Sequence, residues 1–144
     1  MWRSHQSLRE GVTLGLIVGT AIWLWLVIVD AVAGQPFRTF HVLGGIALFT
    51  VLHYLLCLAY GVTAVAVVHR AAREPSLIMA AALGFFLISF AFAMLSALLS
   101  QVGLGHLAWV RILGGNLVGG ILTFFLLSRT HPVLEEFKEA EQEE

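Results

Sequence analysis

VLGGIALFTVLHYLLCLAYGVTAVAVV, residues 42–68, is the stretch that decides the fold, because it is almost wholly apolar over a length that can cross a bilayer. About 20 apolar residues in a helix, rising 1.5 Å each, span roughly 30 Å of hydrocarbon. Three further runs, residues 11–29, 77–100 and 107–127, pass the same test. The sequence therefore predicts an all-α membrane protein with four transmembrane helices.

The composition of the whole chain agrees with this prediction. With 59% hydrophobic and 12% charged residues in 144, the chain has too few polar side chains to cover a soluble globule. A net charge of −1 provides no basic excess for nucleic acid. The single cysteine, Cys57, excludes a disulfide framework and a cysteine-rich metal site. We expect membrane lipids as surroundings, no nucleic-acid partner and no metal.

The connections between the predicted helices are short. They read DAVAGQPFRTFH, HRAAREPS and QVGLGH, and connections of this length place consecutive helices side by side and antiparallel. We therefore expect one up-down-up-down four-helix bundle over residues 1–131. A glutamate-rich, acidic cytoplasmic tail is expected over residues 132–144.

The basic residues that flank the spans predict the orientation of the bundle. Two of them, Arg38 and Arg111, fall on one side of the membrane. The others fall on the opposite side: Arg3, Arg9, Arg70, Arg73, Arg129 and Lys138. This bias predicts that both termini are cytoplasmic, with the first and third connections outside.

Glycines at four-residue spacing mark the expected packing faces of two helices. They are Gly11, Gly15 and Gly19 in the first span, and Gly115 and Gly119 in the fourth. Lipid supplies little hydrophobic drive for helix association, so close approach through small residues must hold the helices together. The pattern favours packing within the bundle and leaves open a contact with another protein, including a second copy of this chain.

His53 is an ionisable residue inside an apolar run. Its neighbours at helical spacing are Thr50 and Cys57, so this face is expected to point into the bundle, near the bilayer midplane. A charged imidazole without an acidic partner is costly there, so we expect a neutral ring. It would bond a hydroxyl, Asn116 or a backbone carbonyl beside a glycine. The alternative is a proton relay or ligand site.

Asp30 ends the first span close to the outer surface, and a lone charge there would be costly. Arg111, one turn into the fourth span, and Arg38, in the first connection, are both within geometric reach. We expect an ion pair of Asp30 with one of them that closes the outer end of the bundle. The alternative is an entry site for a substrate or proton.

Motifs for catalysis are absent from the sequence. It has no P-loop, no dinucleotide-binding glycine motif and no His-Glu-x-x-His, so the chain is not expected to be an enzyme. His41 and His106 share a depth at the outer end and could bracket a b-type haem as an alternative. His5, His69 and His131 are expected to be ordinary interfacial residues on the cytoplasmic side.

Three stretches resemble an uncharacterised family of small bacterial four-helix inner-membrane proteins. They are WLWLVIVDAVAGQPFRTFHVLGG, FTVLHYLLCLAYG and GGNLVGGILTFFLLSRTHP, and the resemblance covers most of the chain except the acidic tail. It implies a multi-pass fold in the bacterial inner membrane. It also implies that Asp30, His53, Asn116 and the His131–Pro132 ending are characteristic features, and it implies no activity.

The leading functional hypothesis is a non-catalytic integral membrane subunit. Such a protein would pack against the other integral subunits of a larger complex, such as a respiratory or photosynthetic electron-transport assembly. One alternative is a redox carrier for b-type haem or a pigment, with His41 and His106 as ligands. The other is a small transporter or proton-conducting module that uses His53, with Asp30 and Arg111 at its mouth.

Overall fold

Four long helices form the frame of the protein. The computed structural model describes residues 2–71, 73, 74 and 76–131; the predicted acidic tail at 132–144 lies outside them. The described residues are helical without a strand, and four of their segments are long and apolar enough to cross a membrane. These segments are Gln6–Val32, Ile46–Ala71, Ser76–Leu107 and Trp109–Thr130.

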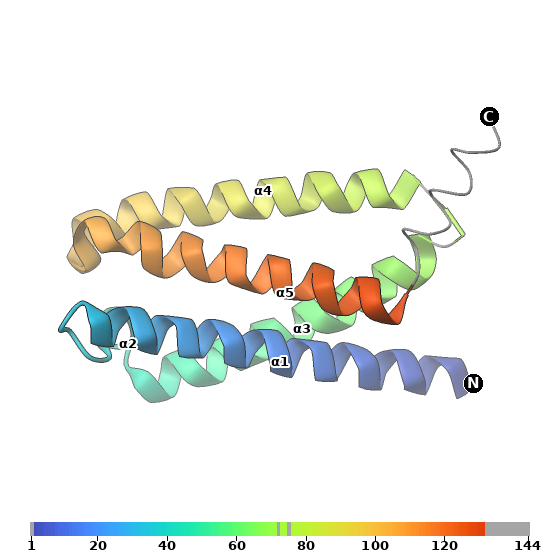
Figure 1. Cartoon of the computed structure of the whole chain (residues 1–144), viewed down its shortest axis with the longest axis horizontal. Helices are drawn as coiled ribbons and strands as arrows, with labels where there is room; N and C mark the ends of the chain where they lie inside the picture. The colour runs from blue at the N-terminus through green and yellow to red at the C-terminus, as the bar shows by residue number, and fades with distance from the viewer. Residues whose placement is uncertain (1, 72, 75, 132–144) are drawn as a thin grey trace.

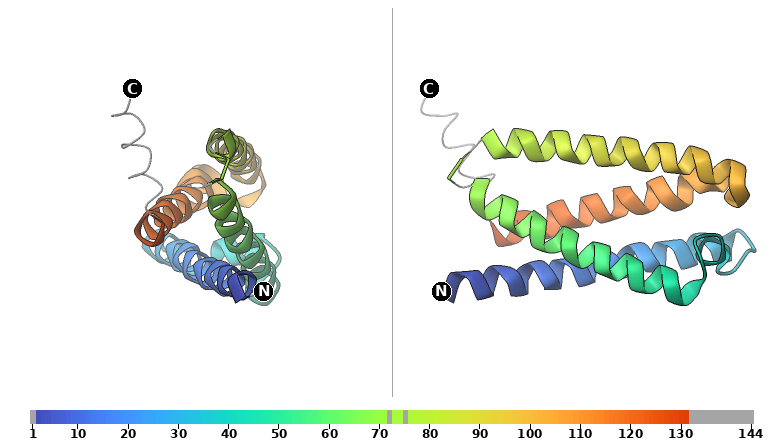
Figure 2. Two further views of the ribbon diagram at one scale, coloured as in Figure 1. Left: turned by 90° about the vertical axis from the view of Figure 1, so that its right-hand side faces the viewer. Right: turned by 180° about the vertical axis from the view of Figure 1, so that it is seen from behind.

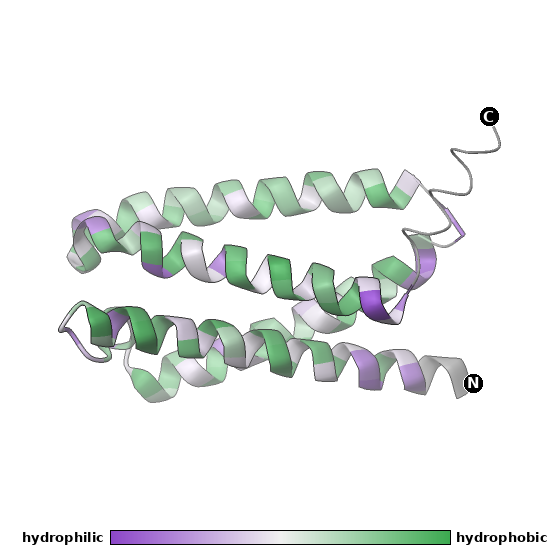
Figure 3. Ribbon diagram, viewed as in Figure 1, coloured by the Kyte–Doolittle hydropathy of each residue, from purple (hydrophilic) through white to green (hydrophobic). Residues whose placement is uncertain are grey.

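The long helices α1 (Trp2–Val32), α3 (Ile46–Ala71), α4 (Ser76–Leu99) and α5 (Gly114–Thr130) alternate in direction (Figure 1). Helix α1 begins, and α5 ends, at one end of the molecule, which we call the Glu10 end. The opposite end, where α1 finishes, is the Asp30 end. Apolar residues run along all four helices, and the hydrophilic residues gather towards the two ends (Figure 3).

Helices α1 and α3 are in backbone contact along a glycine face. A Cβ atom added to Gly11 would lie 2.6 Å from Val62 Cα, and one added to Gly15 would overlap the carbonyl oxygen of Cys57. The facing position on α3 is Gly61, where an added Cβ would overlap the backbone of α1. Only glycine permits this approach, which is the packing mode expected between helices in lipid.

The remaining predicted glycine positions also face neighbours within the chain. A Cβ atom on Gly19 would lie 3.1 Å from Cys57 Cβ of α3, and one on Gly119 would lie 2.7 Å from Ile22 Cδ1 of α1. Gly115 faces Ile22 as well. The glycine faces therefore pack α1 against α3 and α5 inside one molecule.

The second long helix begins later than the sequence predicts. A short helix, α2 (Arg38–Val42), comes first, and Gly44 and Gly45 then adopt φ of 104° and 100°, which side-chain-bearing residues rarely adopt. The chain turns there, and α3 starts at Ile46 instead of residue 42. His53 consequently lies about 10 Å along α3 from its start. Its position at the bilayer midplane stays a prediction.

The reversal between α4 and α5 is a series of wide and tight helical turns. A π-helical turn, η1 (Ser100–Leu104), is followed by a 3₁₀ turn, η2 (Gly105–Leu107), and a second π-helical turn, η3 (Trp109–Leu113). The turns pack against α4 and α2 at the Asp30 end, burying Leu104, Ala108 and Ile112. They hold α4 beside α5 there, and the two helices diverge towards the start of α4 (Figure 2).

Candidate functional site

A cavity of about 530 Å³ lies between α1, α3, α4 and α5, in the place where a closed bundle would have its core. This volume is within the range of ligand-binding pockets, about 300–1,000 Å³. The polar members of its lining are His53, Cys57, Tyr60, Arg111 and Asn116. The remaining walls are apolar, so the cavity is suited to an apolar occupant.

The flank between α3 and α4 leaves the cavity open. Leu52 and Leu56 of α3, and Phe85 and Ile88 of α4, line the cavity and are also exposed on the outside of the molecule. Leu56, for example, is 71% exposed. Because this flank is apolar, the cavity opens towards the region that lipid or another apolar helix would occupy.

His53 projects from α3 towards α1. Its Nε2 lies 2.9 Å from the carbonyl oxygen of Gly19, so Nε2–H donates to an oxygen that can only accept. The ring stacks on Phe49 with 5.3 Å between centroids, and Cys57 Sγ lies 3.7 Å from Nε2. The histidine therefore binds the backbone carbonyl beside a glycine rather than Asn116.

Replacing His53 should have a modest effect that depends on hydrogen bonding. We expect His53→Leu to lower the free energy of unfolding by about 1 kcal/mol, since interhelical hydrogen bonds in membranes are worth roughly 0.6–2 kcal/mol. His53→Gln should recover part of the loss. Equilibrium unfolding in mixed micelles measures both, with exposed His41→Leu as control. Equal stability of His53→Leu and the wild type would contradict the role of the bond.

Further polar contacts join the helices to one another, and two of them involve residues of the cavity lining, Asn116 and Tyr60. Asn116 Nδ2 donates to Ser89 Oγ over 3.2 Å and thereby links α5 to α4. Four other contacts, made by hydroxyl and indole groups, were not predicted from the sequence. Polar side chains within apolar helices were the feature that could have indicated them. These contacts are Tyr60 to Thr123 at 3.1 Å, Trp23 to Thr50 at 3.1 Å, Thr20 to Tyr54 at 2.8 Å and Trp25 to the Val110 carbonyl at 3.0 Å.

Asp30 and Arg111 form an ion pair at the Asp30 end of the cavity. Both side chains are 0% exposed, and Arg111 Nε lies 2.7 Å from Asp30 Oδ1. The carboxylate also accepts the Thr39 hydroxyl at Oδ1 and the Thr39 backbone N–H at Oδ2, each over 2.8 Å. A buried charge needs this degree of pairing, because its desolvation is costly. The pair fixes α2 to α1 and η3.

The rest of the Arg111 guanidinium is held by the two connections. Nη1 donates to the Leu104 carbonyl over 3.0 Å, and Nη2 donates to Gln35 Oε1 over 3.2 Å. The Nε atom has no aligned hydrogen bond, so its contact with Asp30 is an ion pair only. Arg38, the other expected partner of Asp30, instead donates from Nη2 to the Gly103 carbonyl over 3.2 Å. These contacts join the first and third connections to each other at the Asp30 end.

The prediction for His5 falls on a side chain outside the described part of the structure, and the other four histidines besides His53 fall into two groups. His41 on α2 and His106 on η2 are exposed at the Asp30 end, and the haem alternative stays a prediction. At the Glu10 end, His69 and His131 lie against Glu10, and the interfacial position expected for both stays a prediction. The sequence reasoning missed this grouping because its members are far apart along the chain.

The chain was compared with protein-family profiles, with curated proteins and with solved structures, and none of them matches it significantly. The resemblance to small bacterial inner-membrane proteins therefore stays a prediction. The candidate site is an open apolar cavity whose polar side chains are mostly bonded to neighbouring groups outside its lining.

Proposed function

We propose that this protein is a non-catalytic integral membrane subunit whose helix α4 packs against another integral membrane subunit. The observation that carries the proposal is that little of α4 is buried. Of the residues described in Ser76–Leu99, Ser96 and Leu99 alone are buried, and both lie near the Asp30 end. The other described residues of α4 are half-buried or exposed, and the inner side of the helix lines the cavity.

Helix α4 also has a small-residue face that no neighbour within the described chain uses. Ala80 and Gly84 follow each other at four-residue spacing, and a Cβ atom added to Gly84 would meet nothing within 4 Å. By contrast, the backbone of the facing helix occupies the space beside Gly11 and Gly61. Since small residues permit close helix approach in lipid, this face suits an apolar transmembrane helix of a partner.

The proposal includes the topology and the location of the subunit. The basic residues Arg9, Arg70 and Arg73 lie at the Glu10 end, whereas Arg111 at the Asp30 end is neutralised by Asp30. The distribution supports an up-down-up-down bundle with both termini in the cytoplasm. A bacterial inner membrane and an electron-transport assembly are the proposed setting.

The experiment compares a phenylalanine on α4 with one on another exposed face. We expect wild-type protein, extracted from its native membranes in mild detergent, to migrate on native gels with another integral subunit in fixed stoichiometry. Gly84→Phe should release that subunit, because the larger side chain blocks helix approach. Ile121→Phe, at a 69% exposed position of α5, should retain it.

Several outcomes would refute the proposed subunit role. One is a wild-type particle that contains this chain alone, as a monomer or as a homo-oligomer. Another is a Gly84→Phe variant that keeps its partner as firmly as the wild type. Thermal unfolding of the purified variants separates loss of a contact from misfolding, since Gly84 faces open space and its replacement should leave the fold intact.

The cavity favours a second candidate function, the binding of an apolar ligand such as a pigment. Its volume of about 530 Å³ and its opening between α3 and α4 would admit such a molecule from the lipid. Organic extraction of the purified protein, followed by mass spectrometry, tests this function. A stoichiometric apolar molecule beyond bulk lipid would support it, and its absence would remove it.

A further inference from the structure

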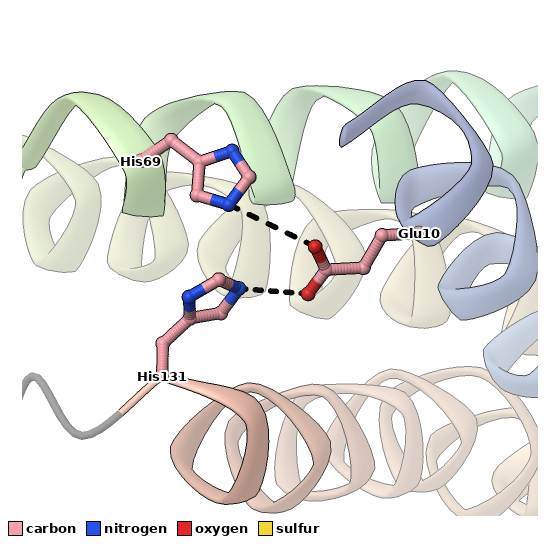
Figure 4. A group of neighbouring side chains, drawn as sticks. All are labelled: Glu10, His69 and His131. Carbon is pink, nitrogen blue, oxygen red and sulfur yellow. Dashed lines mark hydrogen bonds and ion pairs between the residues drawn. The ribbon is translucent and has the colours of Figure 1, made fainter. Parts of the chain in front are cut away.

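Three side chains from three helical segments converge at the Glu10 end (Figure 4). Glu10 is on α1, His69 is in the last turn of α3, and His131 follows the end of α5. Glu10 Oε1 lies 2.7 Å from His131 Nε2, and Glu10 Oε2 lies 3.7 Å from His69 Nε2. One carboxylate thus faces two imidazole nitrogens.

We propose that Glu10, His69 and His131 form a Zn²⁺ site. Each residue offers one ligand atom, and these atoms all lie within 4.8 Å of one another. Ligand atoms about 2.0–2.1 Å from a tetrahedral zinc ion are separated by roughly 3.3 Å. Rotation of the three side chains would bring their ligand atoms from within 4.8 Å of one another to this separation.

The type and exposure of the ligands select the metal. Two imidazoles and one carboxylate form a set that Zn²⁺ uses with water as a fourth ligand, whereas Ca²⁺ and Mg²⁺ prefer sites built from oxygen. Glu10 is 31% exposed, His69 41% and His131 21%, so water can reach the remaining position. A further cavity of about 370 Å³ adjoins Glu10.

The local structure places all three ligands without a metal. His131 is positioned by its backbone N–H, which donates to the Leu127 carbonyl over 2.9 Å and ends α5. The rings of His69 and His131 meet edge to face with 4.7 Å between centroids. A bound ion would join the ends of α1, α3 and α5 in one clamp, so zinc should stabilise the helix ends at this membrane surface.

Zinc titration of the full-length protein tests the site. Metal-free protein without a polyhistidine tag is titrated with Zn²⁺ in detergent against a chromophoric chelator at neutral pH. We expect a single ion per chain and a rise in the thermal unfolding temperature. Glu10→Gln, His69→Ala and His131→Ala should each weaken binding by at least about tenfold and abolish the rise, because each removes a ligand.

Histidines at the opposite end provide matched controls. His41→Ala and His106→Ala should bind zinc as the wild type does, and Co²⁺ should produce the visible bands of a four-coordinate site in wild type and controls alone. The metal-free unfolding temperature shows whether each variant is folded; His131→Gln replaces His131→Ala if the latter is not. Absence of saturable binding, or equal affinity in the three ligand variants and the wild type, would overturn the proposal.

Discussion

Truncating Arg111 to alanine is expected to lower the free energy of unfolding by about 3–5 kcal/mol, because it leaves the charge of Asp30 buried without its partner. Both side chains are 0% exposed and their charged atoms lie 2.7 Å apart. The variant also loses the hydrogen bonds from Arg111 to the Leu104 carbonyl and to Gln35, which join two connections. Unfolding in mixed micelles, followed by circular dichroism, measures the loss.

A double-mutant cycle distinguishes the ion pair from general damage. Asp30→Asn removes the opposing charge while its side chain can still accept from Thr39. Asp30→Asn combined with Arg111→Ala should therefore destabilise by less than the sum of the single variants, with a coupling free energy of about 1–3 kcal/mol. Exposed Arg38→Ala is the control for loss of an arginine. If Arg38→Ala lowered the free energy of unfolding as much as Arg111→Ala does, the buried ion pair would not explain the loss.

Gly61→Ala should be the most damaging small substitution in the helices. A Cβ atom there would lie 2.5 Å from Gly15 N and 2.8 Å from Gly15 Cα, and these are backbone atoms that cannot rotate away. Helices α1 and α3 would have to separate, and we expect a loss on the order of 3 kcal/mol. Unfolding in mixed micelles, followed by circular dichroism, measures this loss. Size-exclusion chromatography in detergent shows whether the variant stays monodisperse.

Gly84→Ala is the matched control for this prediction. It makes the same chemical change in another apolar helix, where the new Cβ would meet nothing within 4 Å. Alanine is the better helix former by roughly 0.5–1 kcal/mol, so Gly84→Ala should be neutral or slightly stabilising. Similar losses at Gly61 and Gly84 would show that the close contact of α1 with α3 is not responsible.

The glycines illustrate how far sequence patterns reach. Repetition in the first span identified Gly11 and Gly15 as a packing face, because small-residue spacing follows directly from helix geometry. Gly61 has no such repeat in its own helix, yet it is the counterpart of both. Which helix a packing face meets depends on how the helices cross, and the order of residues within one helix does not contain that information.

At His53, too, the sequence predicted the face of the helix, and the tertiary structure decided the partner. Its polar and small neighbours predicted an inward position, but three kinds of hydrogen-bond partner were open. The structure selects the Gly19 carbonyl at 2.9 Å, because the glycine contact brings α3 close to the backbone of α1. The turn at Gly44 and Gly45 delays the start of α3 to Ile46 and so places His53 closer to the start of its helix than the predicted span does.

The sequence by itself determined that the described part of the chain has four helices long and apolar enough to cross a membrane, because hydrocarbon thickness and helical rise translate directly into the length of an apolar run. It also marked Asp30 and Arg111 as charges in need of partners. The tertiary structure alone decided that they pair with each other, that Glu10 meets two histidines and that little of α4 is buried. These features depend on helix crossing and on the geometry of the connections, through which residues distant along the chain become neighbours.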